Sequence, residues 1–394
     1  MTVVFLSNYI NHHQIPFCEA CYQQWGGDFF FIQTQPMEQE RLDMGWDPKG
    51  ESLPYVLRFY EQEEKCRRLV LESDVLLAGW SDKEELVQSR LNQGKLTIRI
   101  SERLYREGRW KAISPKGLLH KYQEHIRYRK GPAYLFCAGA YVASDFQLIH
   151  AYPQKMFQWG YFPETREYSK GQLEDLKEKE GVHIVWAGRF IPLKHPEDMI
   201  RLAEDVPDCH IHMVGSGEME QQLKDSVHKK GLEGRVTFYG FRKPDQVRCI
   251  MEKCHIHVFT SDQLEGWGAV VNEAMNSGCA VVANVQAGAV PYLIRQGING
   301  IAYPAGDYVR MRQAVAYLVS QPDQCRRMGQ AAYETIKKLW NAEHAAAVLG
   351  KMIEGIQKGN WEPEKEGPLS PAPVIPPHKM FGWMQENALG DGRR

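Results

Sequence analysis

The stretch VFTSDQLEGWGAVVNEAMNSGCAVVA, residues 258–283, contains two apolar runs separated by a glycine-rich polar loop and an amphipathic segment. The first run ends at Thr260, and the amphipathic segment extends to about Ser277. This order predicts strand, loop, helix and strand, which is the repeating unit of a parallel sheet. The predicted fold class is therefore α/β.

The loop and helix carry residues suited to a sugar joined to a phosphate. Glu265 lies on the loop and Glu273 about two turns along the helix, so both can face a ligand held over the helix N-terminus. Gly266 and Gly268 allow close approach of the backbone, and the helix N-terminus favours an anion such as a diphosphate. Carboxylates accept strong hydrogen bonds from sugar hydroxyls. The pattern thus indicates a sugar phosphate site.

The run Glu265-Gly-Trp-Gly, followed by Asn272-Glu273-Ala-Met and by Gly278 before a valine-rich strand, resembles the signature of glycosyltransferase family 4. Members of that family are retaining GT-B enzymes that use nucleotide sugars. The resemblance implies two Rossmann-like domains facing each other across a cleft, with a C-terminal helix that crosses back to the first domain. It also implies that Glu265 contacts the donor sugar and that Glu273 contacts the ribose.

A second motif follows the strand predicted at residues 183–187. Gly188 frees the backbone there, and the cations Arg189 and Lys194 precede a helix that Pro196 can start. Such an arrangement can hold a diphosphate without metal. The resemblance implies that both cations stabilise the leaving nucleotide diphosphate, with His195 standing where the family usually has glycine.

Other residues of the same half are predicted to contact the donor. A Gly-Ser-Gly turn begins at Gly215, and the resemblance implies that the loop containing Phe241 and Arg242 lies near the nucleotide base. An ordinary turn is the alternative for both. Apart from the catalytic candidates Arg189, Lys194 and Glu265, the predicted donor-binding residues are Gly188, Gly215, Phe241, Arg242, Gly266, Trp267, Gly268 and Glu273.

The N-terminal half has fewer signals. A strand predicted at residues 3–6 leads into a polar loop that contains Asn11, His12 and His13. Ligands of open parallel sheets bind at such loops, so these residues are candidates for acceptor or phosphate contact, with helix capping as the alternative. The predicted domains are an acceptor-binding domain at 1–158, a nucleotide-sugar domain at 159–340, a crossover helix packing on the first domain at 341–358 and a proline-rich, extended or disordered tail at 359–394.

Residues 103–130 form a basic segment, with nine Lys or Arg residues and two Glu residues in a chain of net charge -1. Ser114 and Pro115 predict the start of an amphipathic helix with Leu118, Leu119, Tyr122 and Ile126 on one face. The segment suits an anionic membrane surface or a lipid-pyrophosphate acceptor. A solvated basic face over an ordinary apolar stripe is the alternative. No motif for nucleic acid accompanies the charge.

Composition is compatible with a cytoplasmic two-domain protein. The chain has 394 residues, of which 43% are hydrophobic, and no apolar run reaches the ~20 residues of a membrane span. The N-terminus lacks the pattern of a secretory signal, and nine cysteines at irregular spacings suit reduced thiols. Peripheral attachment to the inner face of the membrane is compatible with the basic segment.

The resemblance implies a retaining, metal-independent hexosyltransferase with no cofactor. Its donor would be a nucleotide-diphosphate sugar, with UDP favoured and GDP as the other option. Its acceptor would be a hydroxyl of a glycan or lipid-linked molecule in bacterial surface polysaccharide or lipopolysaccharide synthesis. A sugar-nucleotide epimerase, a phosphorylase and a non-catalytic carbohydrate-binding protein of the same fold are the alternatives.

Overall fold

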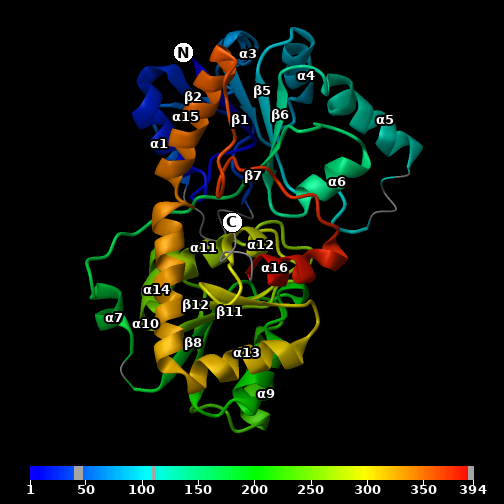
Figure 1. Cartoon of the computed structure of the whole chain (residues 1–394). Coiled ribbons are helices and arrows are strands. Elements are labelled where there is room, and N and C mark those ends of the chain that lie inside the picture. The colour runs from blue at the N-terminus through cyan, green and yellow to red at the C-terminus, as the bar shows by residue number, and fades with distance from the viewer. Residues whose placement is uncertain (40–47, 109–111, 113, 179, 389–394) are drawn as a thin grey trace. The chain divides into compact units, whose positions relative to one another are not determined.

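The computed structural model describes residues 1–39, 48–108, 112, 114–178 and 180–388 (Figure 1). The chain divides into two compact units. The first consists of Met1–Glu164 and Trp340–Ile375, and the second of Thr165–Leu339 and Pro376–Arg394. The chain therefore leaves the first unit a few residues after the predicted boundary at residue 158 and returns to it at Trp340.

The first unit is built on a seven-stranded parallel sheet with the order β3-β2-β1-β4-β5-β6-β7. Its strands are almost wholly buried because helices cover both faces, as parallel sheets require. The strands are β1 (Val3–Ser7), β2 (Phe29–Gln33), β3 (Val56–Arg58), β4 (Val75–Ala78), β5 (Thr97–Ser101), β6 (Ala133–Ala138) and β7 (Met156–Trp159).

Two helices that are distant in sequence pack together in the first unit. The helix α15 (Ala342–Lys358) lies against α1 (Ile15–Trp25) (Figure 1). A Cβ added at Gly350 would lie 2.0 Å from Nε2 of Gln24, so glycine permits this close approach. The remaining helices of the unit are α3 (Glu63–Glu72), α4 (Glu84–Asn92), α5 (Pro115–Glu124) and α6 (Val142–Leu148).

The second unit contains a six-stranded parallel sheet with the order β10-β9-β8-β11-β12-β13. Its strands are β8 (Val182–Ala187), β9 (Cys209–Val214), β10 (Val236–Gly240), β11 (Ile256–Phe259), β12 (Ala280–Asn284) and β13 (Gly300–Tyr303). Its helices are α7 (Gln172–Leu176), α8 (Glu197–Asp205), α9 (Glu220–Lys229), α10 (Pro244–Lys253), α11 (Ala269–Asn276), α12 (Val290–Leu293), α13 (Tyr308–Ser320), α14 (Pro322–Lys338) and α16 (Met380–Ala388). The predicted α/β class is confirmed.

In each unit, the strand order indicates the edge of the sheet at which a ligand would bind. In the first sheet the order reverses between β1 and β4, and in the second between β8 and β11. Ligands of open parallel sheets bind outside the carboxyl ends of the strands at such a switch point. The loops after β8 and β11 contain the two motifs found in the sequence, so the fold brings residues about 75 positions apart to one edge of a sheet.

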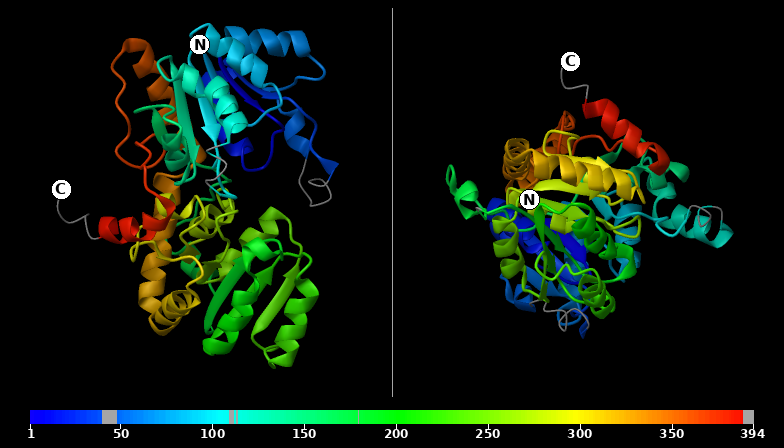
Figure 2. Two further views of the ribbon diagram at one scale, coloured as in Figure 1. Left: turned by 90° about the vertical axis from the view of Figure 1, so that its right-hand side faces the viewer. Right: turned by 90° about the horizontal axis from the view of Figure 1, so that it is seen from below.

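The proline-rich tail is more structured than the sequence predicts. Residues 360–375 follow the edge of β7, where Ser370 accepts a hydrogen bond from Gln158 at 2.8 Å, and Leu369 is fully buried (Figure 2). The tail then forms the helix α16, in which Met380 and Met384 are buried and Phe381 lies under the guanidinium of Arg310 at 5.4 Å. The prediction of an extended or disordered tail is therefore wrong for residues 380–388.

A buried histidine gives the second unit a dependence on pH. His257 lies in β11 with no exposed surface, and its Nδ1 is 3.1 Å from the carbonyl oxygen of Val185. Burial lowers the pKa of His257 to about 4, whereas an unfolded histidine has a pKa of about 6.5. Neutral, buried His257 therefore makes its full contribution to the free energy of unfolding above about pH 6.5. This contribution is lost as the pH falls toward 4, because protonation then favours the unfolded chain.

We expect the free energy of unfolding to fall by ~2 kcal/mol between pH 7.5 and 5.0 because of this residue alone. Urea denaturation at both values would measure the change. In His257→Leu, stability at pH 7.5 should be lower because the hydrogen bond to Val185 is lost, but the pH-dependent loss should shrink by the same ~2 kcal/mol. An unchanged pH dependence in the variant would assign the loss to other groups.

Candidate functional site

Glycines hold two loops of the second unit against each other at the carboxyl edge of its sheet. Gly188 follows β8 and Gly215 follows β9, and the amide of Gly188 donates to Val214 at 3.0 Å. Gly215 has φ +140°, and a Cβ there would lie 1.9 Å from the carbonyl oxygen of Gly188. Only glycine permits this packing, so the loops after β8 and β9 meet through their backbones.

The loop after β8 presents two cations in different surroundings. Arg189 is exposed, and no residue that the structure describes pairs with its guanidinium. Lys194 lies in a 3-10 turn (Pro192–Lys194), and its ammonium forms an ion pair with Glu265 from the loop after β11. The Lys194 and Glu265 side chains are only 16% and 17% exposed. The structure thus brings the three predicted catalytic residues to the edge at the β8–β11 switch point.

A buried hydrogen-bond relay fixes the position of Lys194. The indole of Trp186 donates to the hydroxyl of Thr260 at 2.8 Å, and this hydroxyl donates to the backbone carbonyl of Lys194. The next residue, His195, adopts φ +47°. This left-handed conformation favours glycine, which explains why the resembled family usually has glycine at this position. His195 instead lies 3.3 Å from Asp262, across the two loops.

The glycine loop after β11 is a tightly packed turn. Gly268 has φ +92° and precedes α11, and a Cβ there would lie 2.7 Å from the ring of Phe259. Gly266 accepts a hydrogen bond from the amide of Gly288 at 3.2 Å. Trp267 is 1% exposed, and its indole donates to Asn272 at 2.8 Å. The Trp267 side chain anchors the loop from inside, and the predicted contact of residue 267 with the donor stays a prediction.

The other predicted donor residues lie on neighbouring elements of the second unit. Glu273 is partly exposed on α11. Phe241 is 48% exposed after β10, and Arg242 donates to the carbonyl of Phe241 at 2.8 Å. Arg242 also lines a shallow pocket of about 380 Å³. Gly240 accepts a hydrogen bond from Gly215 at 3.0 Å, so the β10 loop adjoins the loop after β9.

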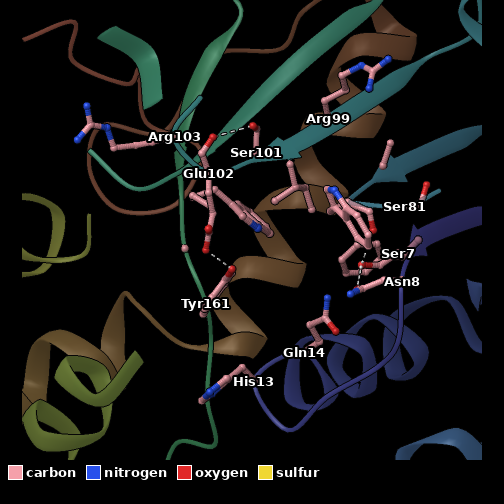
Figure 3. Close-up of a pocket in the computed structure, with 18 of the residues that line it drawn as sticks. Ser7, Asn8, His13, Gln14, Ser81, Arg99, Ser101, Glu102, Arg103 and Tyr161 are labelled. Carbon is pink, nitrogen blue, oxygen red and sulfur yellow. Dashed lines mark hydrogen bonds between the residues drawn. The ribbon is translucent and has the colours of Figure 1, made fainter. Parts of the chain in front are cut away.

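The first unit has a larger pocket of about 640 Å³ at the carboxyl ends of β1, β4 and β5 (Figure 3). Asn11 and His13 line it, whereas His12 does not. Asn11 accepts from the amide of His13 at 3.0 Å and donates to Gln14 at 2.9 Å, so its side chain stabilises the turn before α1. Burial and the neighbouring His12 lower the pKa of His13 to about 3, so His13 is neutral at pH 7 and offers no charge to a phosphate.

Sequence reasoning missed most of the residues that line this pocket. Among them are Glu102 and Arg103, which follow β5, and Tyr161, which follows β7 (Figure 3). In the sequence, only their position after predicted strands pointed to these residues. That position indicates a site weakly as long as the order of the strands in the sheet is unknown. Arg109 and Lys111 of the basic segment lie outside the described residues. Within the described ranges, no group of three or more His, Cys, Asp or Glu side chains is arranged to hold a metal.

Comparison with known proteins assigns the fold and finds a family model that matches within the second unit. The structure resembles that of Anabaena Alr3699/HepE in complex with UDP, with a TM-score of 0.68 and 15% identity over 90% of this chain and 100% of that one. The fold is GT-B. The family model "Glycosyl transferases group 1" matches residues 172–335. The second unit is thus a glycosyl transferases group 1 domain, and the resemblance to glycosyltransferase family 4 is confirmed.

Sequence relatives agree with this assignment. The putative glycosyltransferase EpsD of Bacillus subtilis is 26% identical over 43% of this chain and 46% of its own length. The N-acetyl-alpha-D-glucosaminyl L-malate synthase of Bacillus anthracis is 24% identical over 48% of this chain and 51% of its own. The chain matches about half the length of these curated relatives.

Proposed function

We propose that the protein transfers a sugar from a nucleotide-diphosphate donor, with UDP favoured, to a hydroxyl of a glycan or lipid-linked acceptor in surface polysaccharide or lipopolysaccharide synthesis. The observation that carries this proposal is the convergence of Arg189, Lys194 and Glu265 at the switch point of the second sheet. The UDP complex of the structural neighbour supports the choice of donor. Retention at the anomeric carbon and independence of metal follow the family resemblance.

In this proposal, the charge that grows on the departing diphosphate is stabilised by a site that is already formed. Arg189 is exposed and unpaired among the described residues, so it can approach the phosphates without breaking an ion pair. Lys194 is held by its backbone and neutralised by Glu265 until a donor binds. Glu265 then orients the donor sugar, and Glu273 the ribose. Fixed charges of this kind lower the barrier because they need no reorganisation.

Thermal unfolding with UDP, GDP, ADP and CMP and their sugar conjugates tests the donor. We expect UDP or a UDP-sugar at about 100 times its Kd to add ~2.7 kcal/mol of stability. Glu273→Ala should lose most of this gain, because the ribose contact disappears. Glu334→Ala is the matched control, since Glu334 is a helical glutamate of the same unit whose side chain is 36% exposed and forms an ion pair with Lys338 at 2.8 Å. No response to any of the nucleotides would contradict the proposed function.

Product analysis separates transfer from the other reactions of this fold. Conversion of the donor alone would indicate an epimerase, and a requirement for free phosphate would indicate a phosphorylase. Release of UDP that depends on an added glycan acceptor is the result we expect.

We also propose that α5 attaches the protein to an anionic bilayer. No residue of α5 is buried, and Leu118, Leu119 and Tyr122 are 40%, 55% and 54% exposed. These three side chains of the predicted stripe therefore do not cover the core, whereas the fourth, Ile126, packs against it beyond the end of α5. Lys116, Arg129 and Lys130 supply positive charge beside it, and Figure 1 shows α5 projecting from its unit. Apolar side chains beside basic ones suit the interface of an anionic membrane.

Vesicle binding tests the role of α5. We expect co-sedimentation with phosphatidylglycerol-containing vesicles to fall roughly ten-fold or more in the double variant Leu119→Ser and Tyr122→Ser, because two apolar side chains no longer insert. The control is Val309→Ser with Tyr317→Ser, which changes a similarly exposed pair on α13. Equal binding by both double variants would count against a membrane role. In the structure, no described helix is long and apolar enough to cross a bilayer.

A further inference from the structure

His195 occupies a backbone position that glycine favours, directly after the predicted catalytic Lys194. Its φ of +47° and ψ of +50° place it in the left-handed region, which costs free energy for a residue with a Cβ. Strained backbone of this kind persists where the surroundings hold it in place, and it is frequent beside functional sites. We therefore expect the imidazole to make a contact that glycine could not make.

The imidazole lies between two carboxylates from different segments of the second unit. Its Nε2 is 3.3 Å from Oδ2 of Asp262, in the loop after β11, and its Nδ1 is 3.3 Å from Oε1 of Glu197, in the first turn of α8. The contact with Asp262 joins positions that are 67 residues apart in sequence. His195 thus links the loop that carries Lys194 to the loop that carries Glu265.

Asp262 in turn organises the loop that presents Glu265. Its amide donates to the carbonyl oxygen of Leu193 at 3.0 Å, and its carbonyl oxygen accepts from the amide of Glu265 at 3.1 Å. Its Oδ1 accepts from the amide of Leu264 at 2.8 Å. Asp262 therefore connects the 3-10 turn after β8 to the backbone of Glu265, and the imidazole contacts the second oxygen of its carboxylate.

These side chains are too exposed to stabilise the fold by much. Side-chain exposure is 39% for His195, 21% for Asp262 and 48% for Glu197, so water screens both contacts. Exposed pairs contribute little to the free energy of unfolding. A glycine at position 195 would relieve the backbone strain and lose only these weak contacts. Global stability thus gives no reason for a histidine here, whereas the position of Glu265 does.

We infer that His195 is a positioning residue of the donor site, which holds Asp262 and, through it, the backbone of Glu265. The inference rests on the proposed function, because Glu265 needs a fixed position only if it orients a donor sugar. His195 itself does not have to touch the donor. It occupies the position where the resembled family usually has glycine, so this device belongs to the present chain.

The link matters most when a donor is bound. The ion pair between Lys194 and Glu265 also joins the two loops, but in the proposed reaction it breaks when the phosphates bind Lys194. The contact between His195 and Asp262 can persist at that stage, because neither residue has a proposed role in phosphate binding. It then keeps Glu265 in place while the ion pair is open.

Hydrogen exchange measures the position of the loop without relying on activity. In His195→Gly, we expect the amides of Leu264 and Glu265 to exchange roughly ten-fold faster than in the wild type, because both donate to Asp262. The difference should be at least as large with saturating UDP. The matched control is His150→Gly, since His150 is an exposed histidine of the first unit with φ +51°. It relieves the same strain and should leave the exchange of the loop unchanged.

Kinetics separate positioning from stability. We expect His195→Gly to lower kcat roughly ten-fold, because small displacements of a catalytic group slow the reaction, and to change the affinity for UDP by about two-fold or less. The substrate is the UDP-sugar that stabilises the protein most in thermal unfolding. The urea midpoint of unfolding should not fall, because glycine relieves the strain. A lower midpoint with unchanged kcat would show a structural role instead.

A double-mutant cycle tests whether His195 acts through Asp262. Asp262→Ser keeps an acceptor for the amide of Leu264 but is too short to reach the imidazole. The double variant, which also carries His195→Gly, should lose no more kcat than Asp262→Ser alone, because both changes break the same link.

Two further results would overturn the inference. They are wild-type exchange rates of Leu264 and Glu265 in His195→Gly, and additive losses of kcat in the double variant. Failure of the proposed function is a separate result, since it would appear as absence of stabilisation by UDP in thermal unfolding. Hydrogen exchange in the unliganded protein would still measure the link in that case.

Discussion

We expect Lys194→Ala to lower kcat roughly 10²–10³-fold while changing the affinity for UDP by a smaller factor, because its ammonium opposes charge that is greatest in the transition state. The lysine is well placed for this role. Its side chain is 16% exposed and its backbone carbonyl is fixed by Thr260, so the ammonium acts in a partly desolvated site. Steady-state kinetics with a UDP-sugar, together with calorimetric titration of UDP, would separate the two effects.

The control for this variant is Lys224→Ala. Lys224 also forms an ion pair in the second unit, with Glu220 at 2.7 Å, but its side chain is 46% exposed and lies on α9. Its loss should leave kcat unchanged, since an exposed pair contributes little. If Lys194→Ala retained full activity, Lys194 would have no role in stabilising the leaving group, and Arg189 would remain as the candidate cation.

We expect Gly215→Ala to destabilise the second unit by ~3–5 kcal/mol and to abolish UDP binding. The added Cβ would lie 1.9 Å from the carbonyl oxygen of Gly188, and φ +140° is strained for alanine. Both loops at the switch point would have to move apart, which displaces the backbone that precedes Arg189. Urea denaturation and UDP titration would measure the two losses.

A second glycine serves as a control that distinguishes the steric clash of the added Cβ from the strain of a positive φ. Gly231 also has positive φ, +64°, but a Cβ there would meet no atom within 4 Å. Gly231→Ala should therefore cost only ~1 kcal/mol and leave UDP binding intact. Equal losses of stability in the two variants would mean that the positive φ alone causes the loss. The close approach of the loops after β8 and β9 would then not contribute to stability.

The central motif was predictable because its signal is local. The stretch at residues 258–283 predicted a helix ending near Ser277, and α11 ends at Asn276. The glycine requirement beside Lys194 was also visible, since His195 departs from the family pattern and adopts the conformation that glycine favours. Strand order, in contrast, depends on contacts between distant residues, so it could not be read from either motif alone.

The partners of the basic residues could not be predicted for the same reason. Residues 103–130 have a large positive excess in sequence, but Arg103 pairs with Asp145, forty-two residues away, and Arg106 pairs with Glu102, just before the segment. The pocket that these pairs line was therefore not predictable. The helix at residues 380–388 was missed because the prolines before it dominated the composition, although its two buried methionines are four residues apart.

The discontinuity of the first unit affects how the protein folds during synthesis. Met1–Glu164 leaves the ribosome early, but the helix α15 that covers α1 and the strand-like segment beside β7 follow roughly 200 residues later. At about 5–20 residues per second, the amino-terminal sheet waits on the order of 10–40 s with one face of α1 and one edge of the sheet uncovered. During that interval the second unit can fold as a continuous segment. Chaperones meanwhile have access to the uncovered apolar surface of the first unit.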